Sequence, residues 1–213
     1  MSSTGSGVAV VGGGIMGGDI AVVFSAGNRP VHIAETSGSI RKSIPARVSQ
    51  ALRKRYGSDR ISGPIYAYPS IKEIPWSDVG LAVECVNENL VLKKEIFRQL
   101  EQCAGSNIPF ASNSSGIPIS RISEGLATRS RMLGLHFFMP AHIVPLVEVI
   151  CSRFTDPLVA EEVSATMKSL GKRPVRVSRD IPGFLANRIQ HALMREAIWL
   201  VEEGIASVED VDA

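Results

Sequence analysis

The stretch VAVVGGGIMGGDIA, residues 8–21, decides the fold of this chain. Four small or β-branched apolar residues are followed at once by glycines, and an apolar segment with helical spacing comes next. Gly12, Gly14 and Gly17 form the pattern G-x-G-x-x-G at this junction. Glu35 ends the next predicted strand, 18 residues after Gly17. A glycine pattern alone is a weak signal, but a strand, this pattern, a helix and a later acidic residue together predict a dinucleotide-binding unit.

Each part of this unit has a physical task. Gly12 permits a tight turn, Gly14 lets a pyrophosphate approach the backbone, and Gly17 lets the helix pack close to the strand. The first turn of the helix, which contains Ile15 and Met16, presents unpaired N–H groups to the phosphates. We therefore expect these five residues to bind the cofactor.

Glu35 indicates which dinucleotide binds. Its carboxylate can accept hydrogen bonds from the ribose hydroxyls of the adenosine and would repel a 2′-phosphate, so NAD is favoured over NADP. Arg29, His32 and Arg41 lie near this position in the sequence, which leaves NADP as an alternative. A fold of this type that binds no dinucleotide is a second alternative.

Strands and helices alternate along most of the chain. Strands are predicted at residues 8–12, 31–35, 80–86, 108–113, 133–138, 145–149 and 173–178. Helices are predicted at residues 15–27, 38–56, 88–104, 119–126, 156–171 and 183–204. Gly27 is expected to end the first helix, and Pro45 marks a possible break in the second. The alternation through residue 126 predicts parallel βαβ units and therefore an α/β fold with a Rossmann-type, doubly wound, mostly parallel sheet.

The C-terminal part of the chain predicts the start of an α-helical domain. The helix at 183–204 is apolar on more than one face, and Ser207 with Asp210 three positions later has the pattern of a new helix start. The chain therefore resembles the front part of a longer protein. We expect a flexible tail, an NAD-binding domain and the first part of a truncated helical domain at residues 1–7, 8–182 and 183–213.

Composition and charge argue against several classes of function. Of the 213 residues, 45% are hydrophobic and 21% are charged, as in an ordinary globular protein. A net charge of +2, with scattered basic residues, does not support nucleic-acid binding. No apolar stretch is long enough for a membrane span, and the first residues do not form a secretory signal. Cys85, Cys103 and Cys151 lack metal-ligand spacing, so we expect no metal site and reduced thiols in a cytoplasmic protein.

The segment LGLHFFMPAHIVPLVEV, residues 133–149, places one histidine and one glutamate among apolar residues. A partly buried charged group needs a partner, and each of these two is the obvious partner of the other. If the two predicted strands fold back around residue 142, His136 and Glu148 face each other. The connection is too long for a tight hairpin, so this pairing is a geometric hypothesis.

Several stretches together resemble the L-3-hydroxyacyl-CoA dehydrogenase family. They occur in the family's order and read VVGGGIMGGDIA, ECVNENLVLKKEIFRQLE, ASNSSGIPIS, GLHFFMPAHIVPLVEV and GKRPVRVSRDIPGFLANRI. The resemblance extends over about residues 8–213, and the last residues are also similar to the lambda-crystallin and gulonate 3-dehydrogenase branch. It implies a helical C-terminal domain that mediates homodimer formation and helps to cover the substrate.

Carried over position by position, the resemblance implies a catalytic group of His136, Glu148, Ser115 and Asn187. His136 matches the family's catalytic histidine, and Glu148 matches the glutamate that pairs with it. Ser115, in NSSG, matches a serine near the nicotinamide and the substrate oxygen, and it also counts as a cofactor contact. Glu88 and Lys93, in ENLVLK, match further positions that contact the cofactor.

The chemistry of alcohol oxidation is consistent with these roles. A base must accept the hydroxyl proton while hydride leaves the same carbon, and histidine titrates near neutrality. A carboxylate behind the imidazole fixes its tautomer, while Ser115 and Asn187 can donate hydrogen bonds to the reacting oxygen. Structural alternatives stay open for each position. They are a structural His–Glu pair, a helix cap at Ser115, a helix-surface amide at Asn187, and solvated helix charges at Glu88 and Lys93.

The chain departs from the family pattern at two places. Met139 follows HFF, where an asparagine is usual, and methionine cannot donate a hydrogen bond. The segment between Glu35 and Gly80, where the family has a helical pair that grips coenzyme A, is shortened and contains Pro45, Pro64 and Pro69. Basic residues at 53–55 can meet CoA phosphates or simply form a solvated basic face.

The leading hypothesis is an NAD-dependent oxidoreductase of fatty acid metabolism that interconverts an L-3-hydroxyacyl-CoA and a 3-ketoacyl-CoA. A dehydrogenase of a free 3-hydroxy acid, such as gulonate or carnitine, is the rival enzyme hypothesis, and the shortened segment favours it. A nucleotide-binding protein without turnover, like a crystallin, is the rival from another class. The complete set of four catalytic positions argues against that last alternative.

Overall fold

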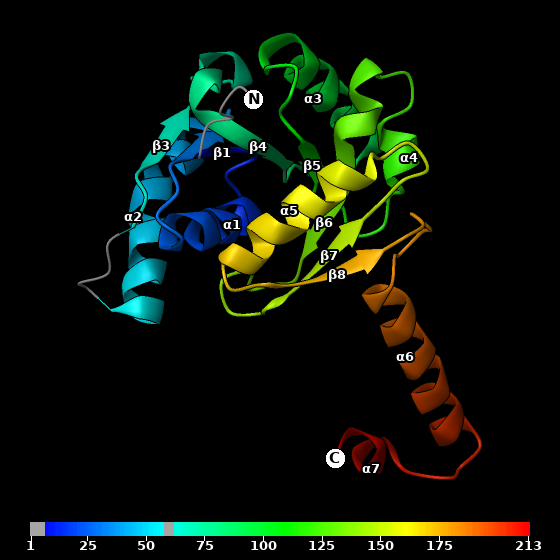
Figure 1. Cartoon of the computed structure of the whole chain (residues 1–213). Helices are drawn as coiled ribbons and strands as arrows, with labels where there is room; N and C mark the ends of the chain where they lie inside the picture. The colour runs from blue at the N-terminus through cyan, green and yellow to red at the C-terminus, as the bar shows by residue number, and fades with distance from the viewer. Residues whose placement is uncertain (1–6, 58–61) are drawn as a thin grey trace.

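The computed structural model describes residues 7–57 and 62–213. Within them, eight strands form one sheet in the order β3-β2-β1-β4-β5-β6-β7-β8 (Figure 1). The strands are β1 (Gly7–Val11), β2 (Val31–Ala34), β3 (Ile65–Tyr68), β4 (Val79–Glu84), β5 (Phe110–Ser112), β6 (Met132–Phe137), β7 (Leu146–Ile150) and β8 (Arg173–Val177). The α-helices are α1 (Ile15–Ala26), α2 (Gly38–Tyr56), α3 (Leu90–Cys103), α4 (Ile119–Ile122), α5 (Pro157–Ser169), α6 (Ala186–Glu202) and α7 (Val208–Asp212). Short 3₁₀ helices lie at Ile71–Glu73, Trp76–Asp78 and Ala127–Arg131.

The strand directions confirm the predicted fold class. Every neighbouring pair from β3 to β6 is parallel, and β3-β2-β1-β4-β5-β6 is the Rossmann strand order. β7 then runs antiparallel to β6, and β8 runs parallel to β7. Residues 1–6 of the predicted tail lie outside the described residues, whereas Gly7 belongs to β1.

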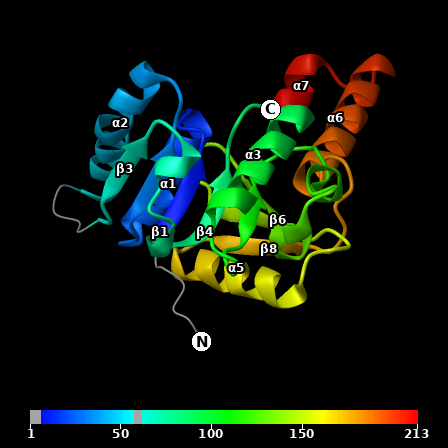
Figure 2. The same cartoon turned by 90° about the horizontal axis from the view of Figure 1, so that it is seen from above.

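Helices cover both faces of the sheet, so its central strands are apolar on both sides. One core cluster joins α1, α2 and α5 to one face of the sheet, and a second joins α3 and α4 to the other face. Figure 2 shows α3 and α5 on opposite sides of the central strands. All five residues of β1 are buried, which explains the continuous apolar run before the glycines.

The structure confirms the predicted end of the first helix and corrects the predicted start of the last one. α1 ends at Ala26 with Gly27 as its C-cap, as predicted; the φ of Gly27 is −83°, and the next residue, Asn28, has the positive φ of 58°. A side chain at residue 27 would place Cβ 2.2 Å from Cδ2 of Leu170, so close packing explains the glycine. The predicted last helix begins at Ala186 and not at Gly183, because the backbone takes a separate turn there.

Two further differences concern the segment after Glu35. α2 continues through Pro45, although a break was possible there. Pro45 is exposed, while Ile44, Val48 and Leu52 are buried at helical spacing, and their packing outweighs a proline cost of about 3 kcal/mol. The strand β3 was not predicted. It is a half-exposed edge strand between two prolines and lacks the apolar run of a buried strand.

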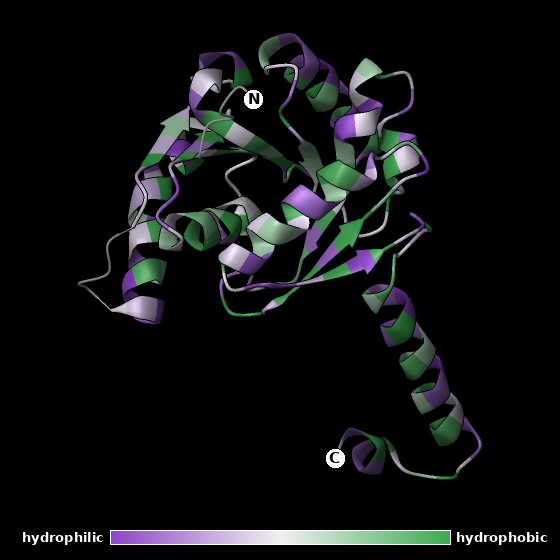
Figure 3. Cartoon of the chain, in the orientation of Figure 1, coloured by the Kyte–Doolittle hydropathy of each residue, from purple (hydrophilic) through white to green (hydrophobic). Residues whose placement is uncertain are grey.

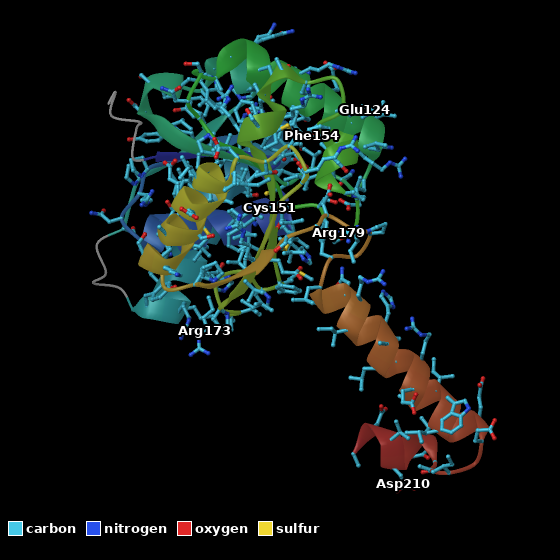
Figure 4. The ribbon with its side chains drawn as sticks, turned by 45° about the vertical axis from the view of Figure 1, so that its right-hand side comes forward. Glu124, Cys151, Phe154, Arg173, Arg179 and Asp210 are labelled. Carbon is cyan, nitrogen blue, oxygen red and sulfur yellow. The ribbon has the colours of Figure 1, made fainter. Side chains whose placement is uncertain are left out.

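α6 projects away from the sheet, and α7 lies at its far end (Figure 1). Ser207 caps α7 by accepting a hydrogen bond from the Asp210 amide at 3.1 Å, as predicted. Figure 3 shows apolar and polar residues alternating around α6, and Figure 4 shows its side chains standing away from the body of the molecule. Its exposed apolar residues include Leu193, Ile198 and Trp199. None of the helices in the described ranges is long and apolar enough to cross a membrane.

Candidate active site

The glycine loop between β1 and α1 has the geometry that a pyrophosphate needs. Gly12 has a φ of +101°, and a Cβ at Gly17 would lie 1.9 Å from the carbonyl oxygen of Gly12. Gly14 is the N-cap of α1 and no side chain caps the helix there, while a Cβ at Gly14 would meet no atom within 4 Å. The first N–H groups of α1, including those of Ile15 and Met16, are therefore open to an anion.

A cavity of about 410 Å³ runs from this loop to the end of β2. Glu35 lines it, with Oε2 accepting a hydrogen bond from the Gly13 amide at 2.8 Å and Oε1 accepting one from the Ser37 amide at 2.7 Å. These bonds fix a negative charge where the adenosine ribose of a dinucleotide would lie, because each oxygen keeps a lone pair for a hydroxyl. The loop and Glu35 thus fit NAD.

The three basic residues that left NADP binding as an alternative lie at different places along and beside β2. Arg41 donates to the backbone carbonyl oxygens of Glu35 and Thr36 at 2.7 and 3.3 Å. His32 is buried within β2, and Arg29 precedes that strand at its other end. None of these three residues lines the cavity of about 410 Å³, and the charged residue of its lining in the described chain is Glu35.

A second cavity of about 320 Å³ adjoins the first, because Cys85 and Val86 line both. The residues lining this inner cavity are Met16, Cys85, Val86, Glu88, Asn113, Ser115, His136, Phe137, Phe138 and Met139. The inner cavity therefore brings together the start of α1, the ends of β4, β5 and β6, and the segment after β6. This arrangement is a nucleotide groove that leads to a histidine.

His136 and Glu148 are partners, as the sequence suggested. They stand opposite each other in the β6–β7 ladder, and His136 Nδ1 lies 2.7 Å from Glu148 Oε2. The carboxylate is 1% exposed, and its Oε1 accepts the backbone N–H groups of Leu185 and Ala186. Burial alone raises the pKa of Glu148, but these hydrogen bonds outweigh it and hold the carboxyl pKa below its ordinary value.

The second ring nitrogen of His136 is left for proton transfer. An ionised carboxylate only accepts hydrogen bonds, so Nδ1 carries the proton and Nε2 is the basic nitrogen. The ring packs between Phe138, with centroids 4.5 Å apart, and Phe184, at 6.0 Å. These contacts fix the imidazole at the wall of the inner cavity.

Ser115 and Asn187 are joined to each other in the structure. The Asn187 side chain on the first turn of α6 donates from Nδ2 to the Ser115 carbonyl oxygen at 2.9 Å. The helix-cap alternative for Ser115 is wrong, because Ser114 Oγ accepts the Ile117 amide at 2.9 Å and Pro118 is the N-cap of α4. Ser115 is instead one of the residues that line the inner cavity.

Glu88 supports the loop that carries Ser115. Its Oε1 accepts the backbone N–H groups of Ser115 and Gly116 at 3.1 and 3.2 Å and a short hydrogen bond from Ser114 Oγ. Burial raises the pKa of Glu88, but these bonds and the nearby Lys93 outweigh it, and the carboxyl pKa lies below its ordinary value. Glu88 also lines the inner cavity.

Lys93 does not have the predicted position. It was expected to contact the cofactor or to be a solvated helix charge, but it is 1% exposed and lines neither cavity. Its Nζ lies 2.7 Å from Glu84 Oε1 and 3.3 Å from Glu88 Oε2, and it donates to the Val86 carbonyl oxygen at 3.2 Å. Lys93 is thus a buried residue that ties the first turn of α3 to the end of β4.

Sequence reasoning missed two polar residues of the site. Glu84 is fully buried at the end of β4 and accepts from Ser112 Oγ at 2.7 Å as well as from Lys93. Asn113 lines the inner cavity and accepts the Phe137 amide on Oδ1 at 2.9 Å. The signal for Glu84 was a carboxylate inside an apolar strand, nine residues before a lysine.

In the described residues, no group of three or more histidine, cysteine or acidic side chains could hold a metal ion. Met139 lies at the rim of the inner cavity and is exposed, so it places a thioether where the resemblance led us to expect an amide. The segment from Phe138 to Val144 is held to α1, because Asp19 Oδ2 accepts the Ala141 amide at 3.1 Å.

Comparisons with known proteins agree with this geometry. The NAD-binding domain of 3-hydroxyacyl-CoA dehydrogenase matches residues 7–181, and the C-terminal domain of the same family matches residues 183–213. The human mitochondrial hydroxyacyl-coenzyme A dehydrogenase is 34% identical over 217 residues, which cover 96% of this chain and 69% of that protein. The lambda-crystallin homolog of Bos taurus is 36% identical over 220 residues, covering 99% of this chain and 68% of that protein.

A solved structure shows the same fold. The 5-formyl-3-hydroxy-2-methylpyridine 4-carboxylic acid 5-dehydrogenase, described as an NAD⁺-dependent dismutase, superposes with a TM-score of 0.87 at 30% identity. The match covers 98% of this chain and 69% of that one. The chain therefore belongs to the 3-hydroxyacyl-CoA dehydrogenase family, and its cofactor is NAD.

Proposed function

We propose that this protein interconverts an L-3-hydroxyacyl-CoA and the corresponding 3-ketoacyl-CoA, with His136 as general acid and base. The observation that carries the proposal is the buried hydrogen bond of 2.7 Å between His136 and Glu148. It stands at the wall of the inner cavity, which adjoins the cavity that fits NAD. A proton acceptor thus lies beside the expected position of a hydride acceptor.

His136 moves the proton. In the direction of oxidation, Nε2 accepts the hydroxyl proton of the substrate, and in the reverse direction it returns that proton to the carbonyl oxygen. The glycine loop and Glu35 would hold NAD, which would supply the acceptor for the hydride of the same carbon. Glu148 keeps the Nδ1 proton in place and stabilises the imidazolium that forms. The carboxylate can do this because its pKa lies below its ordinary value, so it stays ionised at neutral pH.

Ser115 and Asn187 act on the reacting oxygen. Ser115 lines the inner cavity, whereas Asn187 is not among the lining residues and its amide is fixed by its bond to the Ser115 carbonyl oxygen. Each group keeps a hydrogen-bond donor for an oxygen whose charge changes during the reaction. Glu88 holds the backbone of the Ser115 loop, which keeps these donors in register with His136.

The CoA thioester is proposed from the family and from the human relative, whose description names hydroxyacyl-coenzyme A. A free hydroxy acid is the second candidate, and two observations favour it. The 30% identical structure is named for a free pyridine carboxylic acid. Between Glu35 and β3 the described chain has one helix, α2, where the resemblance implies a helical pair for CoA.

The substrate class is tested by following NADH consumption at 340 nm with acetoacetyl-CoA and with acetoacetate in parallel. We expect turnover of the thioester, with kcat/KM at least a hundredfold above that for the free acid. Turnover of acetoacetate alone contradicts the CoA proposal and favours the free-acid candidate. Tight NADH binding without turnover of either compound contradicts both and favours a nucleotide-binding role without catalysis.

A further inference from the structure

The link between β8 and α6 contains an unusual turn. Gly183 and Phe184 follow each other with φ values of +76° and +51°. A positive φ is uncommon for a residue with a bulky side chain, so the surrounding structure must hold Phe184 in this conformation. Its side chain is 1% exposed and packs in the core cluster beneath α3 and α4. Figure 4 shows where this link leaves the sheet, just after the labelled Arg179.

This turn directs the start of α6 at Glu148. No side chain caps α6 at its own N-terminus. The N–H groups of Leu185 and Ala186 instead donate to Glu148 Oε1 at 3.0 and 2.9 Å. Glu148 therefore does for α6 what a capping side chain usually does, although it lies 37 and 38 residues away in the sequence.

The two oxygens of this carboxylate have separate partners. Oε2 meets His136 Nδ1 at 2.7 Å, while Oε1 meets the two backbone N–H groups. Because Glu148 is almost fully buried, its charge depends on these partners and not on water. The Phe184 ring lies beside the imidazole, with ring centroids 6.0 Å apart, so the same turn also supports His136.

We propose that the Gly183–Phe184 turn is a positioning element of the acid–base pair: it aims the first N–H groups of α6 at Glu148 and so keeps this carboxylate charged and fixed against His136. The inference rests on the proposed function, in which His136 transfers the proton. Gly183 and Phe184 are positioning residues, because they act through Glu148 and His136.

Few charged or titratable groups face Glu148 from the neighbouring elements, so a change in its protonation can be traced to the turn. On β6 the facing residue is His136, and on β8 the residue in register is Val175, which carries no charge. From α6 the facing groups are backbone N–H groups, and the Arg188 side chain lies near Gly183. Glu88 is the carboxylate among the described residues that line the inner cavity, and Glu148 lies behind His136 outside that lining.

The first test needs no variant. In the full-length protein, proton NMR is recorded for the imidazole N–H of His136 and for the amides of Leu185 and Ala186 while the pH is lowered. We expect all three resonances to share the transition in which Glu148 gains its proton, because all three protons are bonded to this carboxylate. Amide resonances that do not follow the imidazole resonance would contradict the proposal.

The second test is Gly183→Val, with Gly171→Val as the matched control. Both glycines have a φ of +76°, so a side chain meets the same φ penalty at either position. A Cβ at Gly183 would be in ordinary contact with Arg188 Cγ at 3.5 Å and Asn187 Cβ at 3.8 Å, and a Cβ at Gly171 would meet no atom within 4 Å. A β-branched residue disfavours this φ strongly. Gly171 follows α5 and has no contact with the pair.

For Gly183→Val we expect the midpoint at which the Glu148 carboxyl gains its proton, followed through the Leu185 and Ala186 amides, to rise by about one pH unit. We also expect kcat to fall about tenfold, with the KM for NADH unchanged. Gly171→Val should keep the wild-type midpoint and kcat. If the two variants agree with each other in both quantities, the inference is wrong.

The positioning role of the turn and the proposed catalytic role of His136 can fail separately. If His136→Gln abolishes turnover while Gly183→Val matches Gly171→Val, the positioning role alone is contradicted. If His136→Gln keeps wild-type turnover, the proposed function fails. The common titration of the two amides with Glu148 still decides whether the turn holds the carboxylate.

Discussion

Lys93→Met should leave the buried Glu84 carboxylate without its positively charged partner. The Lys93 ammonium meets Glu84, Glu88 and the Val86 carbonyl oxygen, and the Glu84 side chain has no exposure to water. Methionine has a similar length and shape but no charge. The variant therefore leaves the Glu84 carboxylate in the core without its cation, while Glu88 can still turn to solvent because its side chain is 40% exposed.

The magnitude follows from the partners that remain. Breaking a buried ion pair by removing one partner costs about 3–5 kcal/mol. Glu84 keeps the hydrogen bonds from Ser112 Oγ and from the Val86 amide, both at 2.7 Å, so we expect a loss near the lower end, about 3 kcal/mol. Adding Glu84→Gln removes the orphaned charge, and the double variant should regain about half of that loss.

The loss should depend on pH in a defined direction. Burial raises the pKa of Glu84 above its ordinary value of 4.5, and Lys93 opposes that rise. Without Lys93 the folded-state pKa rises further, so the folded variant binds a proton that the unfolded chain has already released. Stability is then fully present below the unfolded-state pKa and falls as the pH rises through the folded-state pKa.

Urea unfolding of wild type, Lys93→Met and the double variant at about pH 4.5 and about pH 7.5 measures this effect. The difference between wild type and Lys93→Met should be small at the lower pH and about 3 kcal/mol at the higher one. A difference that is equal at both pH values, or a single variant as stable as wild type at the higher pH, would refute the reasoning.

Three further predictions concern the cofactor cavities. Gly17→Ala brings a methyl group within 1.9 Å of the Gly12 carbonyl oxygen and should cost about 1–3 kcal/mol in urea unfolding; Gly14→Ala, with no atom within 4 Å, should keep wild-type stability but bind NADH about tenfold more weakly. Equal stability of the two variants contradicts the packing argument. Glu35→Ala should weaken NADH binding about tenfold and NADPH binding less, measured by fluorescence titration. Burial raises the pKa of the Cys85 thiol, so iodoacetamide should modify it far more slowly than free cysteine at about pH 8.

The parts of the fold with a repeating local signal could be predicted from the sequence. The apolar strand, the glycines and Glu35 gave the nucleotide unit, because each residue type there is dictated by backbone geometry. The pairing of His136 with Glu148 was predictable for a different reason. Both are polar residues in apolar strands, and their equal distance from the bend corresponds to the register of the β6–β7 ladder.

The parts that depend on tertiary contacts could not be predicted. Lys93 looks like an exposed residue of an amphipathic helix, and only the position of Glu84 in the neighbouring strand explains its burial. The turn at Gly183 and Phe184 was read as helix, since nothing local shows that Phe184 is anchored in the core. α2 passes Pro45 because of packing against the sheet, which propensity does not describe.

The central claim is that His136 transfers the proton in an NAD-dependent reaction. The most direct measurement is the turnover of acetoacetyl-CoA with NADH by wild type and by His136→Gln, each at saturating NADH and after confirming equal NADH affinity. The account predicts a kcat for the variant that is lower by roughly a hundredfold to ten-thousandfold, as expected for loss of a general acid–base group. Turnover within tenfold of wild type would contradict the assignment of His136.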